Sequence, residues 1–112
     1  MNNDEKYNYQ KYNQNWKFKY IVCAAIWYQS KDVYAHQPKN VQNGIVSCGL
    51  RHCNCFSILF TMFPDRCYLN NHIDGFLTSD NLFVTRKEAG EIAFKSGQIK
   101  NLTDCLFSED IY

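Results

Sequence analysis

Two short stretches of the sequence carry residue types that can bind an anion. In the first, residues 48–52 (CGLRH), Arg51 and His52 stand where a predicted strand gives way to a predicted helix. In the second, Arg86 follows Thr85 in the first turn of another predicted helix. Backbone amides at a helix N-terminus bind anions, and an adjacent arginine can clamp a phosphate with two hydrogen bonds. Two such helix starts favour a ligand with more than one phosphate.

The positions of Arg86 and Lys87 also have a simpler explanation. Exposed cations in the first turn of a helix cost about 0.3–1 kcal/mol each, because the helix dipole is already positive there. A bound anion would reverse that effect, but both residues can equally be exposed and screened by water. In the same way, Arg51 can be solvated while His52 or Asn54 only caps its helix.

Aromatic residues are candidates for stacking on a nucleobase. Most aromatic residues belong to the core, so Trp27 and Tyr28 are weak candidates. Phe76 and Phe83 are stronger, because we expect them near the basic positions. The predicted ligand-binding residues are therefore Arg51, His52, Phe76, Phe83, Thr85 and Arg86.

The six cysteines are predicted to be reduced thiols. No export signal precedes them, and free thiols are typical of a cytosolic protein. A zinc site is the alternative, with ligands Cys53, Cys55, Cys67 and either His52 or His72. The Cys53-Asn54-Cys55 spacing is not that of a zinc knuckle, and free cysteine is among the commonest buried residues. We therefore expect no metal and no cofactor.

Composition and motifs exclude several classes of function. A net charge of +1 does not favour a protein that binds duplex nucleic acid or an acidic membrane. No apolar run approaches the roughly 18–20 residues of a membrane span, and the N-terminus is too polar for a signal peptide. The phosphate-loop, GxSxG and HExxH motifs of common enzymes are missing. We expect a cytoplasmic protein that is not an enzyme and has no catalytic residues.

The chain is predicted to be a flexible arm, residues 1–15, followed by a single α+β domain, residues 16–112. A mostly antiparallel sheet and two helices make up this domain. The strands are expected at residues 16–29, 33–37 and 45–49, with two short strands inside 72–84. One helix follows Arg51 and stops before Pro64, and the second runs from the Thr85–Glu88 capping box to Ser96.

Finer expectations follow from the apolar pattern. Phe56, Leu59, Phe60 and Phe63 are expected to share one apolar side of the first helix. Gly97 is well placed to cap the second helix at its C-terminus. The C-terminal stretch, LTDCLFSEDIY, contains large apolar residues and is expected to pack onto the domain.

Several motifs together resemble a family of small phage and prophage proteins. They are HQPKNVQNG, CGLRHCNC, DGFLTSDNLFVTRKEAGEIAFKSGQI and the ending LFSEDIY, within a resemblance that begins at about Phe18. This family is associated with anti-Thoeris proteins, sponges that capture a host immune signal. The resemblance implies binding of a cyclic ADP-ribose isomer without cleavage, in the host bacterial cytosol. It also implies a homo-oligomer, a dimer or hexamer, with the ligand pocket between subunits; some members hold cyclic oligonucleotides at separate sites.

The resemblance assigns roles to three positions. Arg51 matches a phosphate-binding arginine, Phe76 matches an aromatic that packs on the ligand, and a polar contact falls around Thr85 or Arg86. The sequence departs from the family pattern where a basic residue, a histidine and an arginine are common. Leu50, Cys53 and Leu82 stand there instead, and Lys100 is the nearest cation to a missing C-terminal arginine.

The leading hypothesis is a binding protein that sequesters a cyclic nucleotide second messenger. One alternative is a small nucleotide-hydrolysing enzyme that uses His52 and an acidic partner. The other is a phage protein that blocks a host protein directly through its aromatic N-terminal arm.

Overall fold

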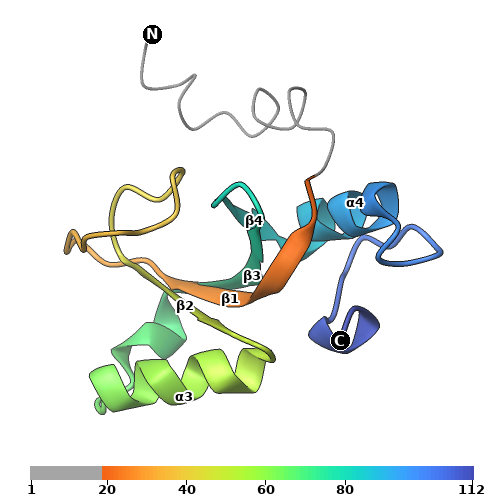
Figure 1. Cartoon of the computed structure of the whole chain (residues 1–112). Helices are drawn as coiled ribbons and strands as arrows, with labels where there is room; N and C mark the ends of the chain where they lie inside the picture. Colours follow the sequence, from red (N-terminus) through yellow and green to blue (C-terminus); the bar gives the residue numbers. More distant parts are fainter. Residues whose placement is uncertain (1–18) are drawn as a thin grey trace, which may run out of the picture.

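The computed structural model describes residues 19–112, so the predicted arm at 1–15 lies outside the described residues. The predicted α+β class is confirmed: a four-stranded antiparallel sheet carries two α-helices (Figure 1). The strands are β1 (Ile21–Tyr28), β2 (Ile45–Gly49), β3 (His72–Thr78) and β4 (Phe83–Thr85). The helices are α3 (His52–Met62) and α4 (Arg86–Ser96), with short 3₁₀ turns η1 (Cys67–Asn70) and η2 (Ser108–Asp110).

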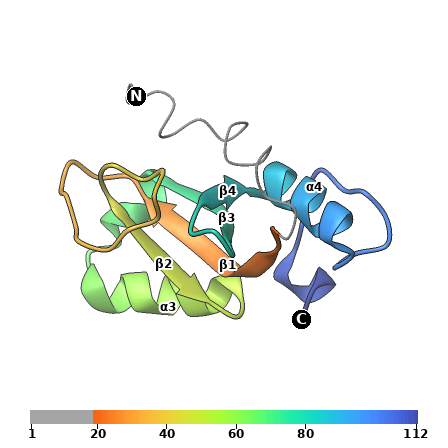
Figure 2. The ribbon, with the colours of Figure 1, turned by 45° about the horizontal axis from the view of Figure 1, so that its top comes forward.

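The strand order is β2-β1-β3-β4, which places β1 inside the sheet. Figure 2 shows β2 beside β1, with α3 beneath them. Ala24, Ala25 and Ile26 are fully buried although neighbouring side chains of a strand point to opposite faces. The central residues of this strand are therefore covered on both faces of the sheet.

The two faces of the sheet carry different apolar clusters. Phe76 and Ile26 belong to the larger cluster, which also contains Leu59 of α3 and Ile92 of α4. The smaller cluster lies on the other face, where the loop that joins β1 to β2 contributes Val41. Both helices thus share one core, and the starts of both helices are held by it.

The predicted strand at 33–37 is wrong. Only an isolated bridge joins Val33 to Gly44 in this region. Two features prevent a strand: His36 has a left-handed backbone with φ of 61°, and the side chain of Gln37 accepts a hydrogen bond from the Val46 amide. Because β2 and β3 already flank β1, this segment forms part of a loop over the sheet.

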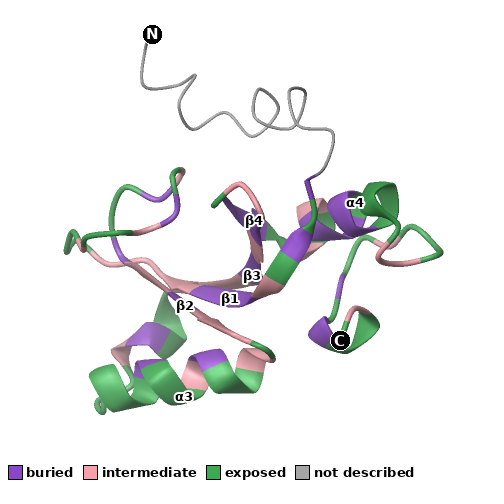
Figure 3. Cartoon of the chain, in the orientation of Figure 1, coloured by how far each residue is buried: buried purple, intermediate pink, exposed green. Residues whose placement is uncertain are grey.

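The side of α3 that meets the core is only partly the predicted apolar side. Cys55 and Leu59 are its buried residues, whereas Phe60 is exposed and the guanidinium of Arg66 lies over its ring, 4.7 Å from the centroid. Figure 3 shows that most of α3 is exposed and that only short parts of it are buried. Phe56 and Phe63 pack at the margin of the core. The small thiol of Cys55 lets the helix lie close to β1, where Cys55 Sγ is 3.5 Å from the Ala24 carbonyl oxygen.

The start and end of α4 follow the prediction. The hydroxyl of Thr85 accepts from the Glu88 amide at 3.3 Å, and the Glu88 carboxylate accepts from the Thr85 amide at 2.9 Å. Gly97 ends the helix in the left-handed conformation. The C-terminal segment then packs down through the fully buried Leu106, so that prediction is confirmed as well.

Gly90 allows the C-terminal segment to cross α4 closely. A Cβ built at this position would lie 2.1 Å from the carbonyl oxygen of Thr103. Alanine favours a helix over glycine by about 1 kcal/mol, but a contact this short forces the backbone of the segment outward. We expect Gly90→Ala to lower the free energy of unfolding by roughly 1–3 kcal/mol, measured by urea denaturation. A more stable variant would show that the segment is not held against the helix.

Candidate anion-binding site

A cavity of about 390 Å³ lies where the starts of the two helices meet. The first residues of α3 form one wall, the first residue of α4 forms another, and the C-terminal segment forms a third. Its lining residues are Arg51, His52, Cys53, Arg86, Phe107, Ser108 and Glu109. The fold therefore brings together the two basic helix starts that the sequence singled out.

Arg51 is the N-cap residue of α3 and lines this cavity. Its amide donates to Asn54 Oδ1 at 3.0 Å, so Asn54 caps the helix as one of the sequence interpretations had it. Its guanidinium is not simply solvated, because Nη2 donates to the main-chain oxygen of Tyr112 at 2.6 Å and Nη1 lies 4.0 Å from Glu109. A hydrogen bond from Ser108, helped by the charge of Arg51, lowers the pKa of Glu109 and keeps it ionised.

Arg86 is held from three sides. Nη1 donates to the carbonyl oxygen of Leu106 at 2.7 Å, and Nη2 lies 3.4 Å from Asp74 Oδ2 of β3. The guanidinium also lies over the ring of Phe107 at 5.2 Å and over Phe76 at 6.0 Å. These contacts fix the charge of Arg86 at the cavity wall, whereas Lys87 beside it is exposed.

His52 is a neutral hydrogen-bond donor in this site. Its Nε2 lies 2.8 Å from the carbonyl oxygen of Gly75, which can only accept, so Nε2 carries the proton. The ring packs edge-to-face on Phe76 with centroids 5.0 Å apart. Burial lowers the pKa of His52 below its ordinary value, and the positive charge of Arg86 lowers it further.

The lowered pKa of His52 predicts a loss of stability in mild acid. An unfolded His52 takes up a proton near pH 6.5, whereas the folded one does so only at lower pH. The contribution of the neutral ring to stability is therefore complete above pH 6.5 and is lost as the pH falls towards the folded pKa. We expect His52→Gln, which keeps a donor, to lose less stability than the wild type between pH 7 and 5 in urea titrations. His36→Gln, at an exposed position, is the control; equal pH dependence of wild type and His52→Gln would contradict the assignment.

The remaining predicted site residues lie in three different places. Phe76 is fully buried beneath His52 and Arg86, so it supports the cavity from below. Phe83 lies on the opposite face of the sheet, against Trp27 with ring centroids 5.7 Å apart, and not near the basic residues as we expected. The side chain of Thr85 is engaged in capping α4.

Sequence reasoning did not place the C-terminal segment in the site. Phe107, Glu109 and Tyr112 all contact one of the two arginines, and Asp74 holds Arg86 from β3. The apolar residues of this segment indicated that it packs down, but not where. After α4 the chain turns back, and this brings the C-terminal segment to the start of α3, which is more than 50 residues away in sequence (Figure 1).

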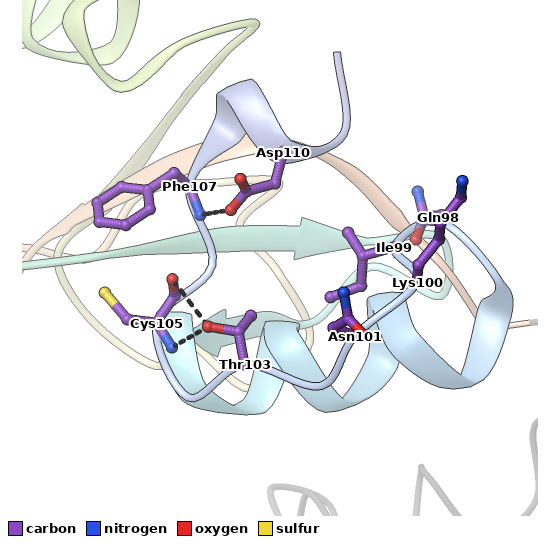
Figure 4. Close-up of a pocket in the computed structure, with 8 residues that line it drawn as sticks. All are labelled: Gln98, Ile99, Lys100, Asn101, Thr103, Cys105, Phe107 and Asp110. Atoms are coloured by element: carbon purple, nitrogen blue, oxygen red, sulfur yellow. Dashed lines mark hydrogen bonds between the residues drawn. The ribbon is translucent and has the colours of Figure 1, made fainter.

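A second cavity, of about 620 Å³, adjoins the first at Phe107 (Figure 4). It lies along the loop after α4, where the Phe107 amide donates to Asp110 Oδ2 at 2.9 Å and Thr103 Oγ1 accepts from the Cys105 amide. Among residues 19–112, Lys100 is the one cation in its lining, and no arginine of this range contributes to it. The charge needed for phosphate binding is therefore concentrated in the smaller cavity.

The thiols do not assemble a metal site within residues 19–112. All six cysteines are free, and no group of three or more histidine, cysteine, aspartate or glutamate residues in that part of the chain is placed to hold a metal ion. Cys53 is exposed and Cys55 buried, and the hydroxyl of Tyr28 donates to Cys67 Sγ at 3.0 Å. Across the same described range, no helix is both long and apolar enough to cross a membrane.

The chain matches a described protein family over most of its length. The model of a family described as phage T4 y16D protein matches residues 20–112. No curated protein and no solved structure matches the chain. The family match covers every residue that lines the arginine cavity.

Proposed function

The chain belongs to the phage T4 y16D protein family, and from this premise we propose that it binds and sequesters a cyclic nucleotide immune signal. A cyclic ADP-ribose isomer is the proposed ligand, with cyclic oligonucleotides as further candidates. The protein would act against a bacterial defence system in the host cytosol, by holding the signal and not by cleaving it. The resemblance to anti-Thoeris sponges supports this assignment.

The observation that carries the proposal is the meeting of Arg51 and Arg86 in one cavity. The two guanidinium groups come from separate helix N-termini, where amides and the helix dipole also favour negative charge. A pyrophosphate group presents two negative centres that such a pair can hold with charge-assisted hydrogen bonds. Because the net charge of the chain is only +1, the two arginines attract a small anion locally and do not give the protein a general affinity for nucleic acid.

The state of His52 supports binding without cleavage. Its proton-bearing nitrogen is occupied by the carbonyl oxygen of Gly75, and the ring packs on Phe76. Within residues 19–112, no carboxylate lies within hydrogen-bond distance of His52 to orient it as a catalytic base. We therefore assign His52 to shaping the cavity and propose that the protein is not an enzyme.

The proposed assembly is a homo-oligomer, a dimer or a hexamer. Because Phe76 is fully buried, an aromatic surface for the base must come from elsewhere in the assembly. Phe107, which is half exposed at the cavity, and a ring from a second subunit can supply it. Multi-angle light scattering at several protein concentrations measures the molar mass of the protein in solution. A monomer at every concentration would contradict a pocket between subunits.

Retention and release of the ligand test the proposed function. The full-length protein is incubated with a panel of cyclic ADP-ribose isomers, separated from free compound by filtration, and heated. Mass spectrometry of the released material should return one isomer intact. A cleaved product would indicate an enzyme, and no retention of any isomer would remove a cyclic ADP-ribose isomer as the ligand. If cyclic oligonucleotides, tested in the same way, are not retained either, the sponge assignment is overturned. Arg66→Ala is a matched control, because Arg66 stacks on Phe60 away from the cavity.

A further inference from the structure

We propose that the C-terminal residues 109–112 act as a built-in substitute for the anion, which a ligand must displace from Arg51. This inference rests on the proposed function, because it describes how the same cavity is regulated. The displaced groups are the main-chain oxygen of Tyr112 and the carboxylate of Glu109. The segment then lies in one position when the cavity is empty and in another when a ligand occupies it.

Both arginines of the cavity donate to the same short segment. Arg86 uses the carbonyl oxygen of Leu106, and Arg51 uses the main-chain oxygen of Tyr112. These oxygens occupy positions around the guanidinium groups where phosphate oxygens would bind. A ligand that takes both arginines must compete with the segment at one or both ends.

The two ends of the segment are anchored differently. Leu106 is fully buried and Ser108 is 1% exposed, so the start of the segment is fixed in the core. Glu109 and Asp110 are exposed, and the end is held mainly by Ile111 at the margin of the core and by the Tyr112 hydroxyl, which donates to the Val22 carbonyl oxygen. The end can therefore move while the start stays in place.

The acidic partners of the two arginines also differ in how firmly they are held. Asp74, which neutralises Arg86, belongs to β3 and cannot leave without opening the sheet. Glu109, which faces Arg51 at 4.0 Å, lies on the exposed turn η2 with 72% of its side chain accessible. Ligand binding can remove Glu109 from the site but not Asp74, so Arg51 is the arginine that changes partner.

The hydrogen bonds of Arg51 show that the substitute is incomplete. Nη1 of Arg51 is buried yet donates no hydrogen bond within the described residues, since Glu109 stays at ion-pair distance. A buried donor without an acceptor is unfavourable. A phosphate with two oxygens can satisfy Nη1 and Nη2 together, which a single main-chain oxygen does not.

Pyrophosphate titration tests this inference without a nucleotide. Isothermal titration calorimetry compares the wild type with Glu109→Gln and Tyr112→Ala, each checked for folding by thermal unfolding. Removing a competing charge or anchor is expected to tighten pyrophosphate binding about 1.5- to fivefold, the range for an exposed ion pair. Glu91→Gln, an exposed carboxylate on α4, is the control. Tyr112→Phe keeps the ring and loses only the hydroxyl that donates to the Val22 carbonyl oxygen, so it should also tighten binding.

The outcomes separate this inference from the proposed function. Affinities that are unchanged or weaker in both variants overturn displacement, even if the nucleotide is retained and the sponge assignment holds. No pyrophosphate binding to any variant overturns displacement too. Hydrogen exchange gives a second readout: the Ile111 and Tyr112 amides, which now donate to Ser108, should exchange faster when the cavity is saturated with pyrophosphate. Slower exchange of these two amides would instead indicate that the segment stays in place as a fixed wall of the cavity.

Discussion

Replacing Arg51 with alanine is expected to abolish retention of the nucleotide, with a loss of affinity of at least about 100-fold. Truncating one partner of a desolvated, hydrogen-bonded charge pair costs about 2–5 kcal/mol, and 2.7 kcal/mol corresponds to 100-fold. Arg51 is the arginine whose second nitrogen still lacks an acceptor, so a phosphate gains most there. Calorimetric titration with the isomer that the retention experiment identifies gives the affinity.

Two further variants define what the loss means. Arg51→Lys should recover only part of the affinity, because a lysine is a point charge and cannot hold a phosphate with two parallel bonds. Arg66→Ala should bind like the wild type. Circular dichroism shows whether the Arg51→Ala fold is intact; an intact fold with unchanged binding would place the phosphate elsewhere.

Replacing Phe76 with alanine is expected to lower the free energy of unfolding by about 3–5 kcal/mol. The ring is fully buried and is the largest side chain in the core that has no exposed surface. It also supports His52 and Arg86 from below. Its removal therefore leaves a cavity under the anion site, which urea denaturation should report as a lower midpoint with an unchanged slope.

Phe76→Leu separates this structural role from ligand stacking. A leucine fills most of the space, and swaps between apolar side chains of similar size usually cost less than about 1.5 kcal/mol. We expect this variant to stay folded and to bind the nucleotide within a few-fold of the wild type. Loss of binding in a stable Phe76→Leu protein would favour direct packing of the ring on the ligand, as the family resemblance implies.

The local features of this fold could be predicted from the sequence because their causes are local. The capping box at Thr85, the stop at Pro64 and the left-handed Gly97 each depend on residues within one or two turns. The two basic helix starts were found in the same way. That they share one cavity could not be predicted locally, because it depends on how β1 and β3 bring α3 and α4 together.

The incorrect predictions concern features that strand register or tertiary packing determines. Val33 to Gln37 has the composition of a strand, but β1 already has partners on both edges. Phe83 pairs with Leu77, and Phe76 pairs with Val84, so the alternation of the hairpin sends the two phenylalanines to opposite faces. We predicted a ligand-binding role for Phe83 because it is close to Arg86 in sequence. Its side chain lies on the face of the sheet that points away from the arginine cavity.

The partners of the two arginines in the C-terminal segment include main-chain oxygens, those of Leu106 and Tyr112. Such acceptors persist whatever side chain stands at the position. An alanine scan of the segment would thus report lost packing or a lost carboxylate but leave these acceptors in place. A backbone ester after Leu106, which weakens that carbonyl as an acceptor, or a chain shortened before Tyr112 would therefore test these main-chain acceptors directly.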